Sequence, residues 1–180
     1  MTLTISAPLS DEYASFYAGY IERAAQREDV YTALSLQIGE LRSALASLTE
    51  IQARFKPGPN EWSIKEVMGH LNDGERVFSY RLLRISRNDT TPLPGFEQDD
   101  FVREAGFDNM SLSDLIDEFE FLRRANILAI RNMSEEALLR CGTASGATVS
   151  ARALIHIMVG HIDHHLESLR EVYLPVAVTL

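Results

Sequence analysis

The spacing of leucine and isoleucine residues between positions 28 and 54 constrains the fold of this chain more than any other feature. Five of these residues are separated by 4, 3, 4 and 3 positions: Leu34, Ile38, Leu41, Leu45 and Leu48. In an α-helix this spacing puts all five side chains on one stripe, which is typical of a helix packed in a bundle. We therefore predict a long helix from Glu28 to Arg54, ended by the Pro- and Gly-rich residues 56–60.

Three further long helices are predicted from their start signals and apolar faces. Ser63 and Glu66 match a capping box, in which the two residues satisfy each other's backbone N–H groups. Ser111 or Ser113 is the expected cap of the next long helix, and Ser150 caps the last. These helices are expected over residues 63–85, from 111 or 113 to about 130, and from 150 to about 173.

Shorter segments complete the predicted fold. Helices are expected over residues 10–26 and 134–139, and residues 142–146 are expected to form a loop. No segment shows the alternation of apolar and polar residues that is typical of a strand. The sequence therefore predicts an all-α fold, a four-helix bundle with one or two short extra helices, as a single domain over residues 1–180.

Charge and composition limit the partners of the chain. Its 180 residues carry a formal net charge of −9, and no cluster of Lys and Arg is present, so neither nucleic acid nor an anionic membrane is an expected partner. Residues 1–11 lack the features of a signal peptide, and the single cysteine, Cys141, cannot form an intrachain disulfide. Both observations favour a cytoplasmic location, with small molecules, metals and other protein chains as the remaining partners.

The histidines are concentrated in the last predicted helix. Four of the five fall within positions 156–165. Helical phase places His161 and His165 one turn apart on an apolar stripe, with His164 at its margin and His156 pointing away. Such a pair presents two nitrogen ligands to a metal, although two histidines held by hydrogen bonds in the core would show the same pattern. A metal site needs a third ligand, and His70 is the only other histidine.

His70, His161 and His165 together would leave one position of a metal open. Such an arrangement is typical of a catalytic rather than a structural metal site. Glu66, Asp73 or a backbone carbonyl could orient the imidazoles, and the sequence does not choose among them. Gly74, in the middle of a predicted helix, is expected to serve close packing or access to a pocket. No catalytic residue is assigned.

Residues 87–110 form a connection that is longer than two packed helices need. Phe96, Phe101 and Phe107 lie in this acidic, Pro- and Gly-containing stretch, and we expect them to be buried. One interpretation is that residues 90–110 form a lid or wall of the metal pocket. The other is that the connection only covers the apolar end of the bundle.

The sequence resembles the DinB-like family, which includes YfiT-like proteins described as metal-dependent hydrolases. The resemblance spans Asp11 to about Leu174. It is carried by three segments in order: Trp62 to Leu71 (WSIKEVMGHL), Pro92 to Phe96 (PLPGF) and Gly160 to Leu166 (GHIDHHL). It implies a four-helix bundle whose metal is bound by one histidine of the second helix and an HxxxH pair of the last. In this sequence those positions are His70, His161 and His165.

The resemblance also implies a reaction. Characterised members include bacillithiol S-transferases and mycothiol-dependent maleylpyruvate isomerases, in which the metal holds a small thiol as thiolate. We therefore expect a thiol-dependent S-transferase that uses a divalent ion, zinc or nickel, a low-molecular-weight thiol and a small-molecule substrate. Family members commonly form homodimers, and the apolar stripe of residues 34–48 could supply part of such an interface or be used inside the chain. The alternatives are a metal-dependent hydrolase that activates water and a non-catalytic stress protein that binds a ligand.

Overall fold

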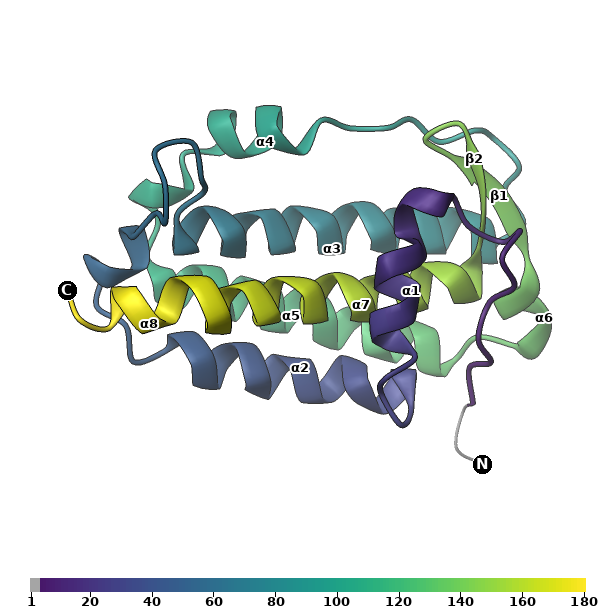
Figure 1. The fold of residues 1–180 in the computed structure, drawn as a ribbon. Coiled ribbons are helices and arrows are strands. Elements are labelled where there is room, and N and C mark those ends of the chain that lie inside the picture. The colour runs from purple at the N-terminus through teal and green to yellow at the C-terminus, as the bar shows by residue number, and fades with distance from the viewer. Residues whose placement is uncertain (1–3) are drawn as a thin grey trace.

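The structure, a computed structural model, describes residues 4–180. Four long helices run side by side along its length: α2 (Val30–Leu45), α3 (Ile64–Ser86), α5 (Leu112–Arg131) and α7 (Ala151–Ser168) (Figure 1). This arrangement confirms the predicted all-α four-helix bundle. None of the helices within residues 4–180 is both long and apolar enough to cross a membrane.

Short elements connect the long helices. The N-terminal part contains η1 (Ser15–Tyr17) and α1 (Ala18–Ala24), and α2 is followed by η2 (Gln52–Arg54). The connection between α3 and α5 contains α4 (Gln98–Ala105) and η3 (Phe107–Asn109). The remaining elements are α6 (Glu135–Leu139), β1 (Cys141–Ala144), β2 (Ala147–Ser150), the π-helical turn η4 (Leu169–Tyr173) and α8 (Leu174–Ala177).

Side-chain caps fix the starts of the long helices as the sequence predicts. The Ser63 hydroxyl accepts from the Glu66 N–H at 3.0 Å, and the Glu66 carboxylate accepts from the Ser63 N–H at 2.7 Å. These reciprocal bonds satisfy two N–H groups that have no partner inside the helix. Ser111 caps α5 and Ser150 caps α7, each by accepting from the N–H three residues on. The predicted helix starts at residues 63, 111 and 150 are thus confirmed.

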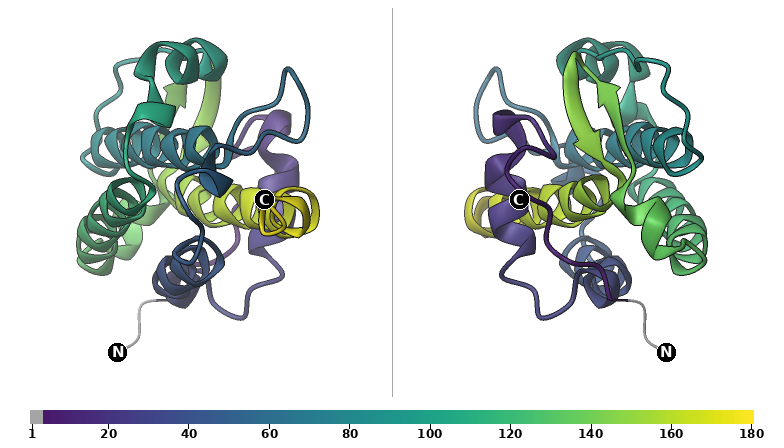
Figure 2. Two further views of the ribbon diagram at one scale, coloured as in Figure 1. Left: turned by 90° about the vertical axis from the view of Figure 1, so that its left-hand side faces the viewer. Right: turned by 90° about the vertical axis from the view of Figure 1, so that its right-hand side faces the viewer.

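The order of the helices around the bundle explains the long connection between α3 and α5. α3 packs against α5 and α7, and α2 packs against the same two, so α2 and α3 face each other across the bundle (Figure 2). α3 and α5 run in the same direction (Figure 1), and Lys65 near the start of α3 donates to the Met110 carbonyl just before α5 at 2.6 Å. The chain must therefore return along the 23 residues of α3, a length of about 35 Å, before α5 begins. α4 lies within this return path.

The prediction of a loop at residues 142–146 is wrong. β1 and β2 form an antiparallel hairpin in which Ala144 pairs with Ala147. Ser145 and Gly146 between them have φ angles of +52° and +78°, as a type I′ two-residue turn requires. Each strand has only four residues, which is too short for alternation to reveal it. Leu93 of the α3–α5 connection pairs with Ala144 and holds the hairpin against the bundle.

Two predicted helix boundaries also differ from the structure. The first helical turn begins at Ser15 rather than Ser10, because Glu12 is bonded to the start of α7. Its carboxylate accepts from the Ser150 hydroxyl and from the Arg152 guanidinium, and the Arg152 bond is the largest cause that lowers the pKa of Glu12 to about 2. α2 ends at Leu45, nine residues before the predicted end at Arg54.

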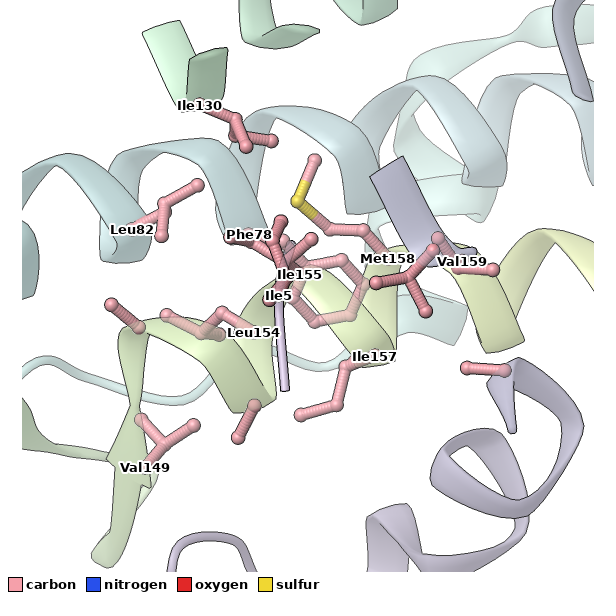
Figure 3. Close-up of a cluster of buried hydrophobic side chains, with 14 of the residues drawn as sticks. Ile5, Phe78, Leu82, Ile130, Val149, Leu154, Ile155, Ile157, Met158 and Val159 are labelled. Atoms are coloured by element: carbon pink, nitrogen blue, oxygen red, sulfur yellow. The ribbon is translucent and has the colours of Figure 1, made fainter. Parts of the chain in front are cut away.

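The core consists of two apolar clusters at opposite ends of the bundle. The cluster at the hairpin end contains side chains of all four long helices and of β2. Figure 3 labels its members on α3, α5, α7 and β2. It includes Leu34, Phe78, Leu82, Ile130, Val149, Leu154 and Met158. The cluster at the other end includes Leu41, Leu45, Leu71, Phe119, Ile162 and Leu166. Leu34, Leu41 and Leu45 are fully buried within the chain, so most of the stripe on α2 is used inside the bundle.

A layer of buried polar side chains separates the two clusters, and we call it the polar layer. Arg123 on α5 forms an ion pair with Glu75 on α3 at 2.8 Å and donates to the Gln37 amide oxygen of α2 at 3.0 Å. The Gln37 amide nitrogen donates to the Val159 carbonyl of α7 at 2.8 Å and to Asp163 at 2.9 Å. The polar layer therefore links all four long helices at one level. Arg123 was not expected in the core from its sequence position.

α1 crosses α7 at Gly160, where the two backbones approach closely (Figure 1). A Cβ atom on Gly160 would lie 1.8 Å from the carbonyl oxygen of Tyr20. Because a backbone carbonyl cannot move without moving α1, only glycine fits at this position. Gly160 precedes His161, so this contact also sets the position of α1 relative to the histidines.

Replacing Gly160 with alanine should therefore push α1 away from α7. We expect Gly160→Ala to lower the free energy of unfolding by about 3 kcal/mol, measured by chemical denaturation. Gly39→Ala is the matched control, because Gly39 lies within a long helix and a Cβ there meets no atom within 4 Å. The control should gain about 0.5–1 kcal/mol from the better helix propensity of alanine. Equal stability changes in the two variants would contradict the close contact.

Candidate metal centre

The structure brings together the three histidines singled out by the sequence. His70 lies on α3, and His161 and His165 lie one turn apart on α7. One ring nitrogen of each lies within 4.8 Å of the others, and the Nε2 atoms of His70 and His161 are 3.0 Å apart. His70 and His161 are buried, and His165 is partly exposed. We call these residues the three-histidine cluster. It lies beside the polar layer, between the two apolar clusters.

Aromatic rings surround the cluster. The Trp62 ring lies 4.8 Å from the His70 ring, between centroids, and the Tyr20 ring lies 5.4 Å from the His161 ring. Phe78 packs edge-on against His161 at 5.5 Å. Nothing in the sequence indicates that Tyr20 packs beside the cluster. For Trp62, its position next to the capping box is the one feature that could have suggested its contact with His70.

Burial keeps the imidazoles of the cluster uncharged. Loss of hydration lowers the pKa of His70 to about 4, with a smaller contribution from the charge of His164. Burial likewise lowers the pKa values of His161 and His165 well below the usual value, and the neighbouring histidines add to the effect. Neutral imidazoles have a free lone pair, which is the form that binds a metal.

The geometry of the cluster fits a divalent ion. Tetrahedral zinc with Zn–N bonds of ~2.0–2.1 Å sets its nitrogen ligands about 3.3 Å apart, close to the 3.0 Å between the two Nε2 atoms. Without an ion, these two atoms can share at most one proton. Among residues 4–180 the side chains of His70 and His161 make no other hydrogen bond, and the side chain of His165 makes none. The cluster thus presents buried nitrogen atoms that the protein itself leaves with few partners, as expected of a metal site.

Glu66 and Asp73 do not orient the imidazoles. The Glu66 carboxylate is occupied by the Ser63 N–H and by the Lys56 ammonium at 2.6 Å. Asp73 is half-buried, and burial is the main cause that raises its pKa. In the part of the chain that the structure describes, neither carboxylate bonds to a histidine. The suggestion that one of them fixes the ring orientation is therefore not supported.

The other two histidines lie outside the cluster. His156, predicted to point away from the apolar stripe, is buried, and its Nδ1 atom lies 2.9 Å from the Arg152 carbonyl oxygen. Its predicted direction is not contradicted, but its burial was not expected from the sequence. Residues of the N-terminal segment bond to the start of α7 near this side chain. His164 is half-buried, and its ring lies 5.0 Å from that of His165. As predicted, His164 borders the pair without belonging to it.

Two cavities reach the cluster from different sides. The larger, of about 460 Å³, is lined by His70, His161, Tyr20 and Phe78, and by residues 96–99 of the α3–α5 connection. The smaller, of about 300 Å³, is lined by His164, His165 and Trp62. Asp99 lines both. Residues 96–99 of the connection therefore form part of a cavity wall beside the cluster, while the interpretation that residues 90–110 as a whole form a lid or wall of a metal pocket stays a prediction.

The three phenylalanines of the connection differ in burial. Phe107 is buried and packs against α3 at Gly69. Phe96 is half-buried at the larger cavity, and Phe101 is 44% exposed. The expectation that all three are buried is therefore correct only for Phe107. The exposure of Phe101 is a consequence of α4, which turns one of its faces toward solvent.

Comparison with known proteins places this fold and cluster in a family. Residues 33–169 match the model of the DinB superfamily, so the chain belongs to this superfamily. No curated protein sequence matches the chain.

Two solved structures share the fold. One is YfiT from Bacillus subtilis, described as a probable metal-dependent hydrolase with an unusual four-helix bundle topology. It is 15% identical, with a TM-score of 0.73 and 93% of each chain covered. The other is a mycothiol-dependent maleylpyruvate isomerase, 16% identical with a TM-score of 0.65. That match covers 78% of this chain and 59% of the isomerase, so this chain spans less than two thirds of the isomerase. At these identities the likeness shows the fold.

The His161 ring rests on Gly74, which suggests a test of how the ring is positioned. A Cβ on Gly74 would lie 2.9 Å from Cε1 of His161, so the ring must shift in Gly74→Ala. We expect the imidazole NMR signals of His161 to move while those of His156 stay unchanged. Gly39→Ala again serves as control and should move neither set. Unchanged His161 signals in Gly74→Ala would contradict the contact.

Proposed function

We propose that this protein binds one divalent metal ion through His70, His161 and His165. The observation that carries the proposal is the convergence of three neutral imidazoles, two buried and one partly exposed, with ring nitrogens within 4.8 Å of one another. Imidazole ligands favour zinc, nickel, copper or iron over magnesium and calcium, and we propose zinc or nickel. The two cavities beside the cluster give small molecules access to the open position.

We further propose that the protein is a thiol-dependent S-transferase. When bound, the ion would act as a Lewis acid that lowers the pKa of a thiol or a water molecule at its open position. The chain's own cysteine is unsuited to supply the sulfur. Cys141 is exposed on β1, away from the cluster, and desolvation raises the pKa of its thiol. A low-molecular-weight thiol is therefore the proposed co-substrate, in line with the thiol named in the description of the similar isomerase.

The protein's own residues would shape this chemistry by position and by exclusion of water. Tyr20, Phe78 and Trp62 pack around the imidazoles and keep them dehydrated. Residues 96–99 close the larger cavity from the side of the α3–α5 connection. A pocket wall that includes Tyr20, Phe78 and Phe96 shields the reacting centre from part of the bulk water, which favours attack by a sulfur nucleophile over hydrolysis.

A metal-dependent hydrolase is the second candidate. The observation that favours it is Asp99, a carboxylate that lines both cavities next to the cluster and so lies where a general base would be needed. The similar YfiT is also described as a probable hydrolase.

The homodimer expected from the resemblance remains a prediction, and the apolar stripe on α2 does not support it because most of the stripe is buried inside the chain.

The metal proposal predicts distinct effects of the five histidines. His70→Ala, His161→Ala and His165→Ala should each reduce the metal content of untagged protein well below one ion per chain, by elemental analysis. His156→Ala should keep the metal and instead lower the free energy of unfolding by about 2 kcal/mol, because a buried side chain is lost. His164→Ala should reduce the metal content less than any of these three substitutions. Loss of metal in His164→Ala together with its retention in His161→Ala would refute the assignment.

The transferase proposal predicts activity that needs both metal and added thiol. Metal-loaded protein would be incubated with several small thiols and 1-chloro-2,4-dinitrobenzene, and separately with nitrophenyl esters. We expect thioether formation above the uncatalysed rate, lost in His161→Ala and unchanged in the control Cys141→Ser. Ester hydrolysis without thiol would instead indicate the hydrolase. Metal binding without either reaction would indicate a non-catalytic ligand-binding protein.

A further inference from the structure

One buried cation has no acidic partner among residues 4–180. Among the described residues, Lys65, Arg81 and Arg123 are the buried positive side chains. Lys65 pairs with Glu50, and Arg123 pairs with Glu75. Arg81 is only 3% exposed, yet no carboxylate lies within 4.0 Å of it in residues 4–180. Buried arginines are normally paired, since an isolated charge loses its hydration without compensation.

The contacts of Arg81 are all with neutral groups. Its Nη2 atom donates to the Pro94 carbonyl at 2.9 Å and to the Ser145 hydroxyl at 2.8 Å. Its Nη1 atom is 3.5 Å from the Tyr17 hydroxyl, a weak contact. The ring of Phe96 lies 5.9 Å from the guanidinium carbon. These groups hold the guanidinium in place, but none of them neutralises its charge.

Four segments converge on this guanidinium, two of them far from α3 in the sequence. They are α3, η1, the α3–α5 connection and the hairpin turn. Ser145 occupies a turn position with φ of +52°, where asparagine, aspartate or glycine is usual. Its hydroxyl is the group that accepts from Arg81, which gives a reason for a serine there. Backbone strain of this kind is often found at ligand sites.

Arg81 lies on the same face of α3 as His70. The two residues are eleven positions apart, which is about three turns. A cavity of about 330 Å³ is lined by Arg81, Val77 and Phe96, and Phe96 also lines the larger cavity that reaches His70 and His161. Phe96 therefore borders both cavities. Arg81 lines one of them, and His70 and His161 line the other.

We propose that Arg81 is the anion-binding end of the metal-centre pocket, and that the substrate or co-substrate is an apolar molecule with a carboxylate. Eleven residues of helix separate Arg81 from His70 by about 16 Å along the axis of α3. The proposed ligand is therefore long enough to place its carboxylate and its reacting atom at separate ends of the pocket. This inference rests on the proposed metal site, because that site defines the reacting end.

A carboxylate fits better than a phosphate. Both Nη2 hydrogens of Arg81 are engaged by Pro94 and Ser145, so Nε and Nη1 are left to donate single N–H bonds to one carboxylate. A dianionic phosphate usually needs more positive charge than this. Arg76 also lines the 330 Å³ cavity beside Arg81, but it is already paired with Glu118. Glu97 and Asp99 line the larger cavity and are exposed. Their charges disfavour polyanions, so one negative charge on an apolar body is the better match.

The test compares ω-phenylalkanoates of increasing length with the corresponding neutral amides by isothermal titration calorimetry. In the metal-loaded protein we expect at least a tenfold preference for the carboxylate at one or more lengths. Arg81→Met should remove this preference and leave amide affinity unchanged. The control Arg84→Met, one turn further along α3, should keep the preference, because Arg84 is already bonded to Asp89.

The outcomes separate this proposal from the metal proposal. Retention of the preference in His70→Ala would show that the carboxylate binds at Arg81 rather than at the metal. Loss of the preference in His70→Ala, with retention in Arg81→Met, would overturn the role of Arg81 and leave the metal site intact. Equal binding of carboxylates and amides, or no binding of any carboxylate at millimolar concentration, would also overturn it.

A second measurement needs no variant and covers the case in which Arg81→Met does not fold. In ¹⁵N-labelled wild-type protein, the Nε–H signal of Arg81 should shift on titration with the carboxylate and not with the amide. The Nε–H signal of Arg84 is the internal control and should stay in place. A shift of neither signal at saturating carboxylate would overturn the proposal.

Discussion

The polar layer is the interaction on which the rest of this structure depends. Arg123, Glu75 and Gln37 come from three helices, and Gln37 bonds to the backbone of the fourth at Val159. Because removing one partner of a buried ion pair leaves an uncompensated charge, at a cost of about 3–5 kcal/mol, sliding any helix by one turn is strongly disfavoured. An apolar core alone would tolerate such a shift more easily. The polar layer thus fixes the relative heights of α2, α3, α5 and α7.

These fixed heights determine where the histidines meet. On α3, Gly74 lies one turn after His70, and Glu75 follows it. On α7, Val159 comes directly before the segment from Gly160 to His165. The bonds of the polar layer to Glu75 and Val159 therefore set α3 and α7 side by side at the level of the cluster. The missing side chain of Gly160 allows α1 to pack against α7 next to His161, and the missing side chain of Gly74 leaves room for the His161 ring. Dehydration then follows from packing, and it keeps the imidazoles neutral and ready to bind a cation.

The topology adds the enclosure around this cluster. Because α3 and α5 run parallel, the connection between them must return along the length of the bundle. This connection contains α4, and its residues 96–99 line the larger cavity. The same path brings Pro94 to Arg81, where the hairpin turn also arrives. A bundle with antiparallel neighbours and short loops would bury the same apolar faces, but it would not supply these walls.

The sequence by itself determined the helices, their serine caps and the three histidines, because these depend on local spacing and on helical phase. The caps at Ser63, Ser111 and Ser150 act over three residues, and the i, i+4 pair His161 and His165 is a property of a single helix. Only the tertiary structure decided the features that depend on segments far apart in the chain. These include the burial of His156, the four-residue strands of the hairpin, the parallel course of α3 and α5, and the absence of an acid beside Arg81 in the described residues. No local pattern encodes them, because each is settled by which distant groups come into contact when the four helices pack.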